Sequence, residues 1–271
     1  MSPAPLFPLS PREVYRRHTL HEVVCQFRFP SILRIGAESP APFQERIRKL
    51  YPQYGQDIPG QPPRAIQELI ERLSIPGMPF SESHRFSTLD KLHAVTLTPD
   101  SWAVSSRSYE GWESFLERVL FVQQEFSQEY KPAAYLRIGL RYVDRIVRSK
   151  LNLDRVGWRN LLNSELAGFL GSDDFSDWVD EIKTQVDFRL PDMKDSRLRL
   201  IHGLQRMPGT GEPSYVIDAD LFTIGSITAD DATQILQQFH STAGNLFRWA
   251  TKGQLREALE PVTNANRGTG S

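Results

Sequence analysis

The amino-acid sequence predicts an α+β fold with a largely antiparallel sheet. Residues 135–147 alternate between apolar and polar side chains, which is the period of a strand with one buried face. Residues 110–129 and 229–250 instead carry apolar side chains at every third or fourth position, the spacing typical of amphipathic helices. Elements with one apolar face must bury that face against another element. We therefore expect one continuous sheet with two long amphipathic helices on one of its faces.

The first half of the chain is expected to begin with an extended arm and to continue with strands and helices. The arm, residues 1–17, contains four prolines. Residues 51–63 are rich in proline, glycine and glutamine, which favours a loop. The other expected elements are strand 20–29, helices 42–50 and 64–73, a hairpin of strands 84–97 and 101–108, helix 110–129 and strand 135–147.

The second half is expected to be irregular at first. Residues 151–182 contain helical pieces and an acidic run from Ser172 to Glu181. Strands are expected next at 183–190, 197–206 and 214–224, followed by helix 229–250. We expect the first half to cover residues 18–150, the second half to cover 151–260 and pack on the first, and 261–271 to form a disordered tail.

Two segments suggest an internal duplication. Gln26-Phe-Arg-Phe-Pro30 is similar to Asp187-Phe-Arg-Leu-Pro191, and each half continues through a hairpin into a long helix. One interpretation is a divergent duplication of a single α+β unit. The other is that two amphipathic halves share such patterns by chance.

The composition is that of an ordinary globular protein. The chain has 271 residues, of which 39% are hydrophobic, and a formal net charge of -1. Cys25 is the only cysteine, so no intramolecular disulfide can form, and its place in a strand predicts a buried, inert thiol. The sequence shows neither a signal-peptide pattern nor an apolar run long enough to span a membrane, which favours the cytoplasm. The small net charge neither indicates nor excludes a nucleic-acid partner, because a local patch can lie within a neutral total.

Arginines mark the polar face of the predicted strand 135–147. Arg137, Arg141 and Arg145 share this face because side chains two positions apart point the same way. Guanidinium groups donate hydrogen bonds in pairs to phosphates and carboxylates, so a converging set would suit an anionic ligand or a nucleic acid. The alternative is a solvated sheet face, or cross-strand ion pairs with acidic residues such as Asp187. Further strand arginines complete the candidate binding set: Arg28, Arg189, Arg197 and Arg199.

No catalytic pattern in the sequence is convincing. Asp218 and Asp220 lie on the same face of a strand, and paired carboxylates can hold Mg²⁺ or serve acid–base chemistry. His18 and His21 are the only close histidine pair, whereas a zinc site needs three or four converging ligands. We therefore predict no catalytic residue, no metal site and no cofactor. A metal-dependent phosphoesterase at Asp218 and Asp220 stays the least favoured alternative.

Aromatic residues flank the acidic run. Trp158 lies before it, Phe175 lies inside it and Trp178 lies near its end. Exposed aromatic side chains concentrate binding energy at protein interfaces. These three residues are therefore candidate protein-interface residues, and the alternative is that they cover the core.

Several segments of the chain together carry a resemblance. They are Leu20-His-Glu-Val-Val-Cys-Gln-Phe-Arg-Phe29, Arg85-Phe-Ser, Val95-Thr-Leu-Thr-Pro-Asp, Tyr109 with Trp112 before a helix, and Arg137-Ile-Gly-Leu-Arg-Tyr142. The chain thereby resembles, over nearly its whole length, a sporadically distributed bacterial family of uncharacterised proteins. The resemblance carries no catalytic residues. The patchy distribution of that family is similar to that of genes in mobile or defence-related islands, which implies an accessory role by association only.

These observations favour a non-enzymatic accessory protein that binds another protein of the same operon or complex, and the family resemblance implies a bacterial setting related to antiviral defence. The alternative is nucleic-acid or nucleotide binding through the arginine-lined sheet face. No membrane partner is expected from either hypothesis.

Overall fold

The computed structural model describes residues 4–57, 83–207 and 209–262. The predicted helix 64–73 lies outside these residues. Of the predicted tail 261–271, only residues 261 and 262 are described.

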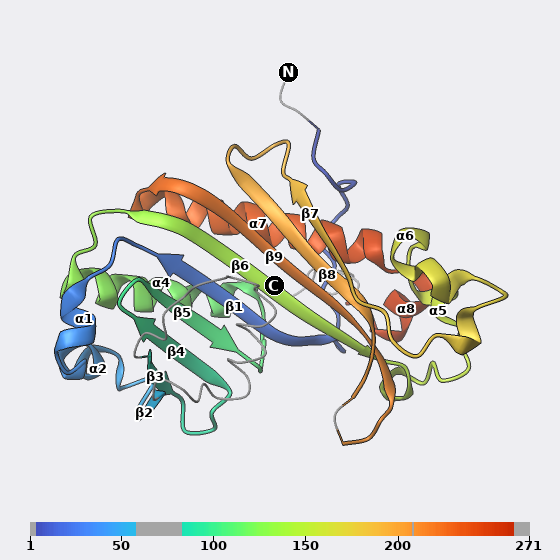
Figure 1. The fold of residues 1–271 in the computed structure, drawn as a ribbon, viewed down its shortest axis with the longest axis horizontal. Coiled ribbons are helices and arrows are strands. Elements are labelled where there is room, and N and C mark those ends of the chain that lie inside the picture. Colours follow the sequence, from blue (N-terminus) through green and yellow to red (C-terminus); the bar gives the residue numbers. More distant parts are fainter. Residues whose placement is uncertain (1–3, 58–82, 208, 263–271) are drawn as a thin grey trace, which may run out of the picture. The chain divides into compact units, whose positions relative to one another are not determined.

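The structure is an α+β fold with a large antiparallel sheet and several helices (Figure 1). Within the described residues, the strands are hydrogen-bonded in the order β2-β3-β4-β5-β1-β6-β9-β8-β7. Their bounds are β1 (Leu20–Arg28), β2 (Gln53–Asp57), β3 (Ser83–Ser87), β4 (His93–Thr98), β5 (Ser101–Ser106), β6 (Tyr135–Val147), β7 (Thr184–Arg189), β8 (Ser196–Arg206) and β9 (Pro213–Ile227).

The helices differ greatly in length. The bounds are α1 (Leu33–Ala37), α2 (Ala41–Ile47), α4 (Trp112–Tyr130), α5 (Trp158–Leu161), α6 (Ser164–Ala167), α7 (Ala229–Ala250) and α8 (Gly253–Ala258). Short 3₁₀ turns are η1 (Ser149–Leu151), η2 (Gly168–Gly171) and η3 (Ser176–Trp178). The sequence prediction of a loop over 51–63 was wrong at its start, because β2 forms there by pairing with β3.

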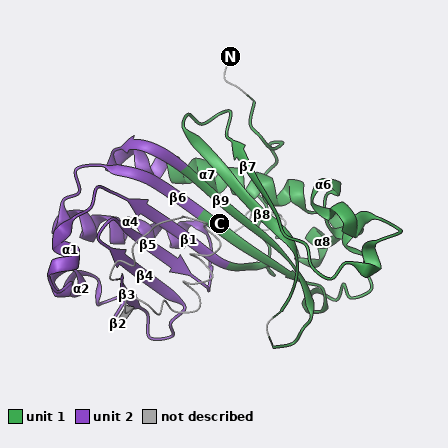
Figure 2. Cartoon of the chain, viewed as in Figure 1, with its two compact units in different colours: residues 1–21, 141–222, 235–271 green, residues 22–140, 223–234 purple. Residues whose placement is uncertain are grey.

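The chain forms two compact units, neither of which is continuous in sequence (Figure 2). Unit 1 contains residues 1–21, 141–222 and 235–271, and unit 2 contains residues 22–140 and 223–234. Two of the boundaries fall inside β6 and β9, so these long strands contribute to both units.

The core of unit 2 is built on aromatic packing. The ring of Phe27 on β1 stacks on Trp102 of β5, with centroids 4.3 Å apart. Helix α4 covers this face of β5 and adds Phe126, which also meets Phe43 of α2. Cys25 is fully buried beside these residues, and burial raises the pKa of its thiol. The thiol is therefore protonated and unreactive at neutral pH.

The described part of the N-terminal arm packs against other elements of unit 1. The ring of Phe7 contacts Phe188 of β7 and Trp249 of α7. Farther along, Tyr15 forms a β-bridge with Pro261, and the backbone N–H of Val262 donates to the carbonyl of Val14 at 2.7 Å. The described part of the predicted tail is thus paired with the arm.

Candidate functional site

Arg141 and Asp218 form a buried ion pair between β6 and β9. The Nε of Arg141 donates to Oδ1 of Asp218 at 2.6 Å, and Nη2 donates to Oδ2 at 2.5 Å. Both side chains are less than a tenth exposed. This two-bond geometry is the strong form of an arginine–carboxylate pair. Arg141 is therefore a core residue rather than a surface binding residue, and both oxygens of Asp218 are occupied by its guanidinium rather than open to a metal.

Two more candidate arginines have acceptors close by in unit 2. The Nη2 of Arg28 donates to Oδ2 of Asp100 at 2.7 Å. The Nη1 of Arg137 donates to Oε1 of Gln26 on β1 at 3.0 Å. These contacts match the structural alternative considered from the sequence, in which the arginines satisfy neighbouring groups.

Arg199 of β8 forms a cross-strand pair with Asp187 of β7. Its Nε and Nη2 donate to the two carboxylate oxygens at 2.8 and 3.1 Å. The hydrogen bond from Arg199 lowers the pKa of Asp187, and the same bond, together with the charge of Asp220, raises the pKa of Arg199. The pair is partly solvated, so its electrostatic contribution is smaller than that of the buried pair.

Arg189 and Arg197 are the remaining arginines of this hairpin. They lie directly opposite each other in the register of β7 and β8, and both are exposed. Like charges at directly opposite positions repel. The arginine at position 145 lies on β6, where its backbone N–H donates to the carbonyl of Thr19 at 2.8 Å.

The irregular segment of unit 1 presents exposed aromatic side chains. Phe169 is 66% exposed, Phe175 is 54% exposed and Trp178 is 85% exposed. The rings of Phe169 and Phe175 meet edge to face at 6.1 Å, and the N–H of Trp178 donates to the carbonyl of Phe175 at 2.9 Å. We call Phe169, Phe175 and Trp178 the aromatic surface.

A buried scaffold anchors the part of the aromatic surface that carries Phe169. Leu166 and Leu170 lie in the core directly before and within η2. The hydroxyl of Tyr215 on β9 donates to the carbonyl of Leu166 at 2.6 Å and also contacts Nδ1 of His202 at 2.7 Å. Burial lowers the pKa of His202, so this imidazole is neutral near pH 7.

Trp158 does not belong to the aromatic surface. It is 6% exposed and packs against Tyr215, with ring centroids 5.6 Å apart. The guanidinium of Arg148 also lies over the ring of Trp158, 4.7 Å from its centroid. The proposed interface role of Trp158 is therefore corrected to a core role, while Phe169 joins the exposed set. The sequence signal for Phe169 was an aromatic residue between two glycines, Gly168 and Gly171, next to the acidic run.

Acidic residues surround the aromatic surface. Asp173, Asp174 and Asp177 are all exposed. Asp173 forms an ion pair with Arg159, and Asp180 forms one with Arg206. The surface therefore combines apolar rings with a local excess of negative charge.

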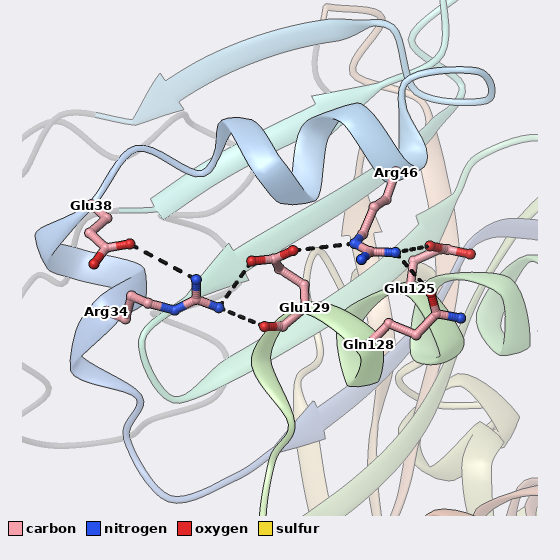
Figure 3. A network of polar contacts seen from close by, with 6 residues as sticks. All are labelled: Arg34, Glu38, Arg46, Glu125, Gln128 and Glu129. Atoms are coloured by element: carbon pink, nitrogen blue, oxygen red, sulfur yellow. Dashed lines mark hydrogen bonds and ion pairs between the residues drawn. The ribbon is translucent and has the colours of Figure 1, made fainter.

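A polar network in unit 2 joins helices α1, α2 and α4 (Figure 3). Glu129 accepts from Nη2 of Arg34 at 3.0 Å and from Nε of Arg46 at 3.2 Å. Arg46 also contacts Glu125 at 3.3 Å and Gln128 at 2.8 Å. Each charge in the network faces an opposite charge. The network therefore stabilises the packing of the helices and does not form an open binding site.

Within residues 4–57, 83–207 and 209–262, no three His, Cys, Asp or Glu side chains come together as metal ligands would. Asp218, the first carboxylate of the phosphoesterase hypothesis, is held by Arg141. Among the same residues, no helix is both long and apolar enough to cross a membrane. No family model matches the chain, and a search of curated proteins finds no match.

Proposed function

We propose that this protein is a non-enzymatic adaptor that binds a partner protein through the aromatic surface. The observation that carries the proposal is the exposure of Trp178, the largest aromatic side chain type, beside two exposed phenylalanines. Large apolar side chains that cluster in the open usually mark an interaction site. Burying each of these rings in a partner would contribute about 1.5–3 kcal/mol.

One part of the segment that carries the rings is anchored to the core. The buried Leu166 and Leu170 and the Tyr215 hydrogen bond fix the backbone around Phe169, so little ordering of this part is needed on binding. Pre-organisation of this kind lowers the entropic cost of association.

The charges around the rings indicate the chemistry of the partner. Asp174 and Asp177 flank Phe175 and Trp178 in sequence and are exposed. An apolar pocket edged by lysine or arginine side chains would be complementary to this surface, both in shape and in potential. We propose that such a protein is encoded with this one, in the bacterial setting that the family resemblance implies.

Capture of the partner from the native host, followed by binding to the purified partner, tests the proposal. The tagged protein is recovered from lysate treated with nuclease, and each candidate partner is then purified. Phe175→Ala and Trp178→Ala should abolish capture and weaken binding of the purified partner. Leu89→Ala is the matched control, since Leu89 is an apolar side chain of unit 2 that is 75% exposed.

A charge reversal distinguishes specific binding of the partner from nonspecific apolar association. Asp174→Lys with Asp177→Lys should weaken binding of the partner, whereas Glu257→Lys, an exposed acidic residue on α8, should not. Equal binding by wild type and Trp178→Ala would contradict the proposal, as would a captured species that disappears after nuclease treatment.

The duplication is a second proposal, and the strand order favours it. The order β3-β4-β5-β1 followed by β6-β9-β8-β7 is symmetric about the junction of β1 and β6. In each half the hairpin strands lead into a helix, α4 or α7. The symmetry matches β1 with β6, and not with β7 as the similar Phe-Arg segments suggested. Superposition of β1, β3–β5 and α4 on β6–β9 and α7 tests the duplication, and a failure to superpose would remove it.

A further inference from the structure

Strand β7 forms an end of the sheet in unit 1. Among the strands that the structure describes, β8 is the one hydrogen-bonded to β7. The register is antiparallel and runs from Thr184 opposite His202 to Arg189 opposite Arg197. One side of β7 therefore faces β8, and the other side is an edge.

Hydrogen bonds just beyond the two ends of β7 show which residues direct their backbone groups toward that edge. The N–H of Ile182 donates to Leu204 at 2.9 Å, and the N–H of Leu190 donates to Ser196 at 3.1 Å. Both residues have even numbers, and successive residues of a strand alternate in the direction of their backbone groups. The odd-numbered residues from 181 to 189 thus point their N–H and C=O groups toward the edge.

The side chains of these odd-numbered residues carry charges in a self-complementary order. They are all exposed, and their signs are negative, positive, neutral, negative and positive for Glu181, Lys183, Gln185, Asp187 and Arg189. Reversing the direction of the strand and the sign of each charge leaves this order unchanged.

We propose that two copies of this chain pair through β7, antiparallel and about a two-fold axis at Gln185. In this register Glu181 lies opposite the second copy's Arg189, and Lys183 lies opposite its Asp187. The symmetry repeats both pairs, so four ion pairs form around a central pair of glutamines, and each Asp187 then accepts from Lys183 of the other copy in addition to its own Arg199. The inference is independent of the adaptor function and concerns a different set of residues.

Neighbouring registers that keep the same backbone bonding are less favourable. Centring the axis on Val186 places Lys183 opposite the second copy's Arg189, and centring it on Thr184 places Glu181 opposite the second copy's Asp187. Opposite like charges repel in a sheet, whereas opposite unlike charges attract. Charge thus selects one register.

The other face of β7 supports the same register. The side chains of Thr184, Val186 and Phe188 on this face, and of Ile182 just before the strand, are only partly buried in one copy. Pairing about Gln185 places Ile182 opposite Phe188 and Thr184 opposite Val186. Aromatic and β-branched pairs across strands are stabilising. The side chains on both faces of β7 therefore favour the same partner, a second copy of the chain, and the same register.

Sedimentation equilibrium of the full chain over a range of concentrations tests the proposal. The wild type should form a dimer whose dissociation constant rises with NaCl, because the charge pairs are exposed and screened. Arg189→Glu places like charges in two of the four pairs and should weaken the dimer about tenfold or more. Glu181→Arg should do the same, and the double variant should restore the wild-type affinity. Arg155→Glu, an exposed arginine away from β7, is the control with the same change of charge.

A backbone variant provides the second readout. Gln185→Pro removes an N–H that points to the edge and leaves the bonds to β8 intact, so it should abolish the dimer without lowering the melting temperature appreciably. The proposal is overturned by a wild type that stays monomeric up to its solubility limit. The proposal would also be overturned if Arg189→Glu and Gln185→Pro both dimerised with the affinity of the wild type.

Discussion

The Arg141–Asp218 ion pair and the aromatic surface both belong to unit 1, yet only one of them is exposed. The arginine lies on a regular strand with a polar face, and the structure buries it in a two-bond pair. The aromatic rings lie on an irregular segment, and the structure leaves them in solvent. Periodicity tells which side chains share a face of a strand, but not whether that face is open to water. In unit 1, the exposure of the large aromatic side chains therefore separates a candidate surface from a core ion pair, a distinction that the charge pattern of the strand does not make.

The largest expected effect concerns the buried ion pair. Arg141→Ala or Asp218→Ala should each lower the free energy of unfolding by about 3–5 kcal/mol, because an uncompensated charge stays buried. Urea denaturation measures this loss. Arg28→Ala is the control, since its pair with Asp100 is more exposed and should cost about 1 kcal/mol or less. If Arg28→Ala lowered the free energy of unfolding as much as Arg141→Ala does, the distinction between a core pair and a surface pair would be removed.

A second prediction concerns Asp144, another polar residue of β6. Burial raises the pKa of Asp144 to about 6, and the hydrogen bond that Thr19 donates to it, at 2.7 Å, lowers it again only in part. The unfolded chain loses this proton near pH 4 and the folded chain near pH 6. This carboxyl group therefore makes stability fall as the pH rises from about 4 to 6.

Asp144→Asn tests this dependence, because the amide oxygen still accepts from Thr19 while the charge is removed. The variant should be more stable than the wild type above pH 6, by about 2 kcal/mol, and similar to it at pH 4. Unfolding curves at several pH values measure the difference. Curves that stay parallel from pH 4 to pH 7 would contradict the assigned pKa.

The smallest expected effect concerns the exposed arginines of the hairpin. Arg197→Glu replaces a like-charge pair with Arg189 by an unlike pair and should raise the free energy of unfolding by about 0.5 kcal/mol. The gain should shrink in high salt, as thermal unfolding would show. A loss of stability would mean that Arg197 has a favourable contact that the repulsion does not outweigh.

Much of the strand pattern could be predicted from the sequence. Alternation over 20–29 and 135–147 marks β1 and β6, and the Thr98–Ser101 turn joins β4 to β5. Strand β2 was missed because Gln53–Asp57 has a composition closer to a turn, and it becomes a strand only through pairing with β3. Local propensity cannot reveal pairing of this kind.

The candidate site was predicted only in part. Phe175 and Trp178 were named from their place in the acidic run, but Trp158 was grouped with them although it is buried against Tyr215. A tryptophan suits either environment, so its position in the chain does not decide its exposure. The ion-pair partner of Arg141 could not be predicted from the sequence either, because Asp218 lies 77 residues from it.

The most direct test of the central claim is the affinity of the captured partner for Trp178→Ala, measured by titration calorimetry beside wild type, Leu89→Ala and Arg28→Ala. The adaptor account predicts a loss of about 2 kcal/mol or more for Trp178→Ala, since a ring at the centre of an interface contributes strongly. It predicts wild-type affinity for the two controls and unchanged stability of Trp178→Ala. Wild-type affinity in Trp178→Ala would show that the aromatic surface is not the binding site.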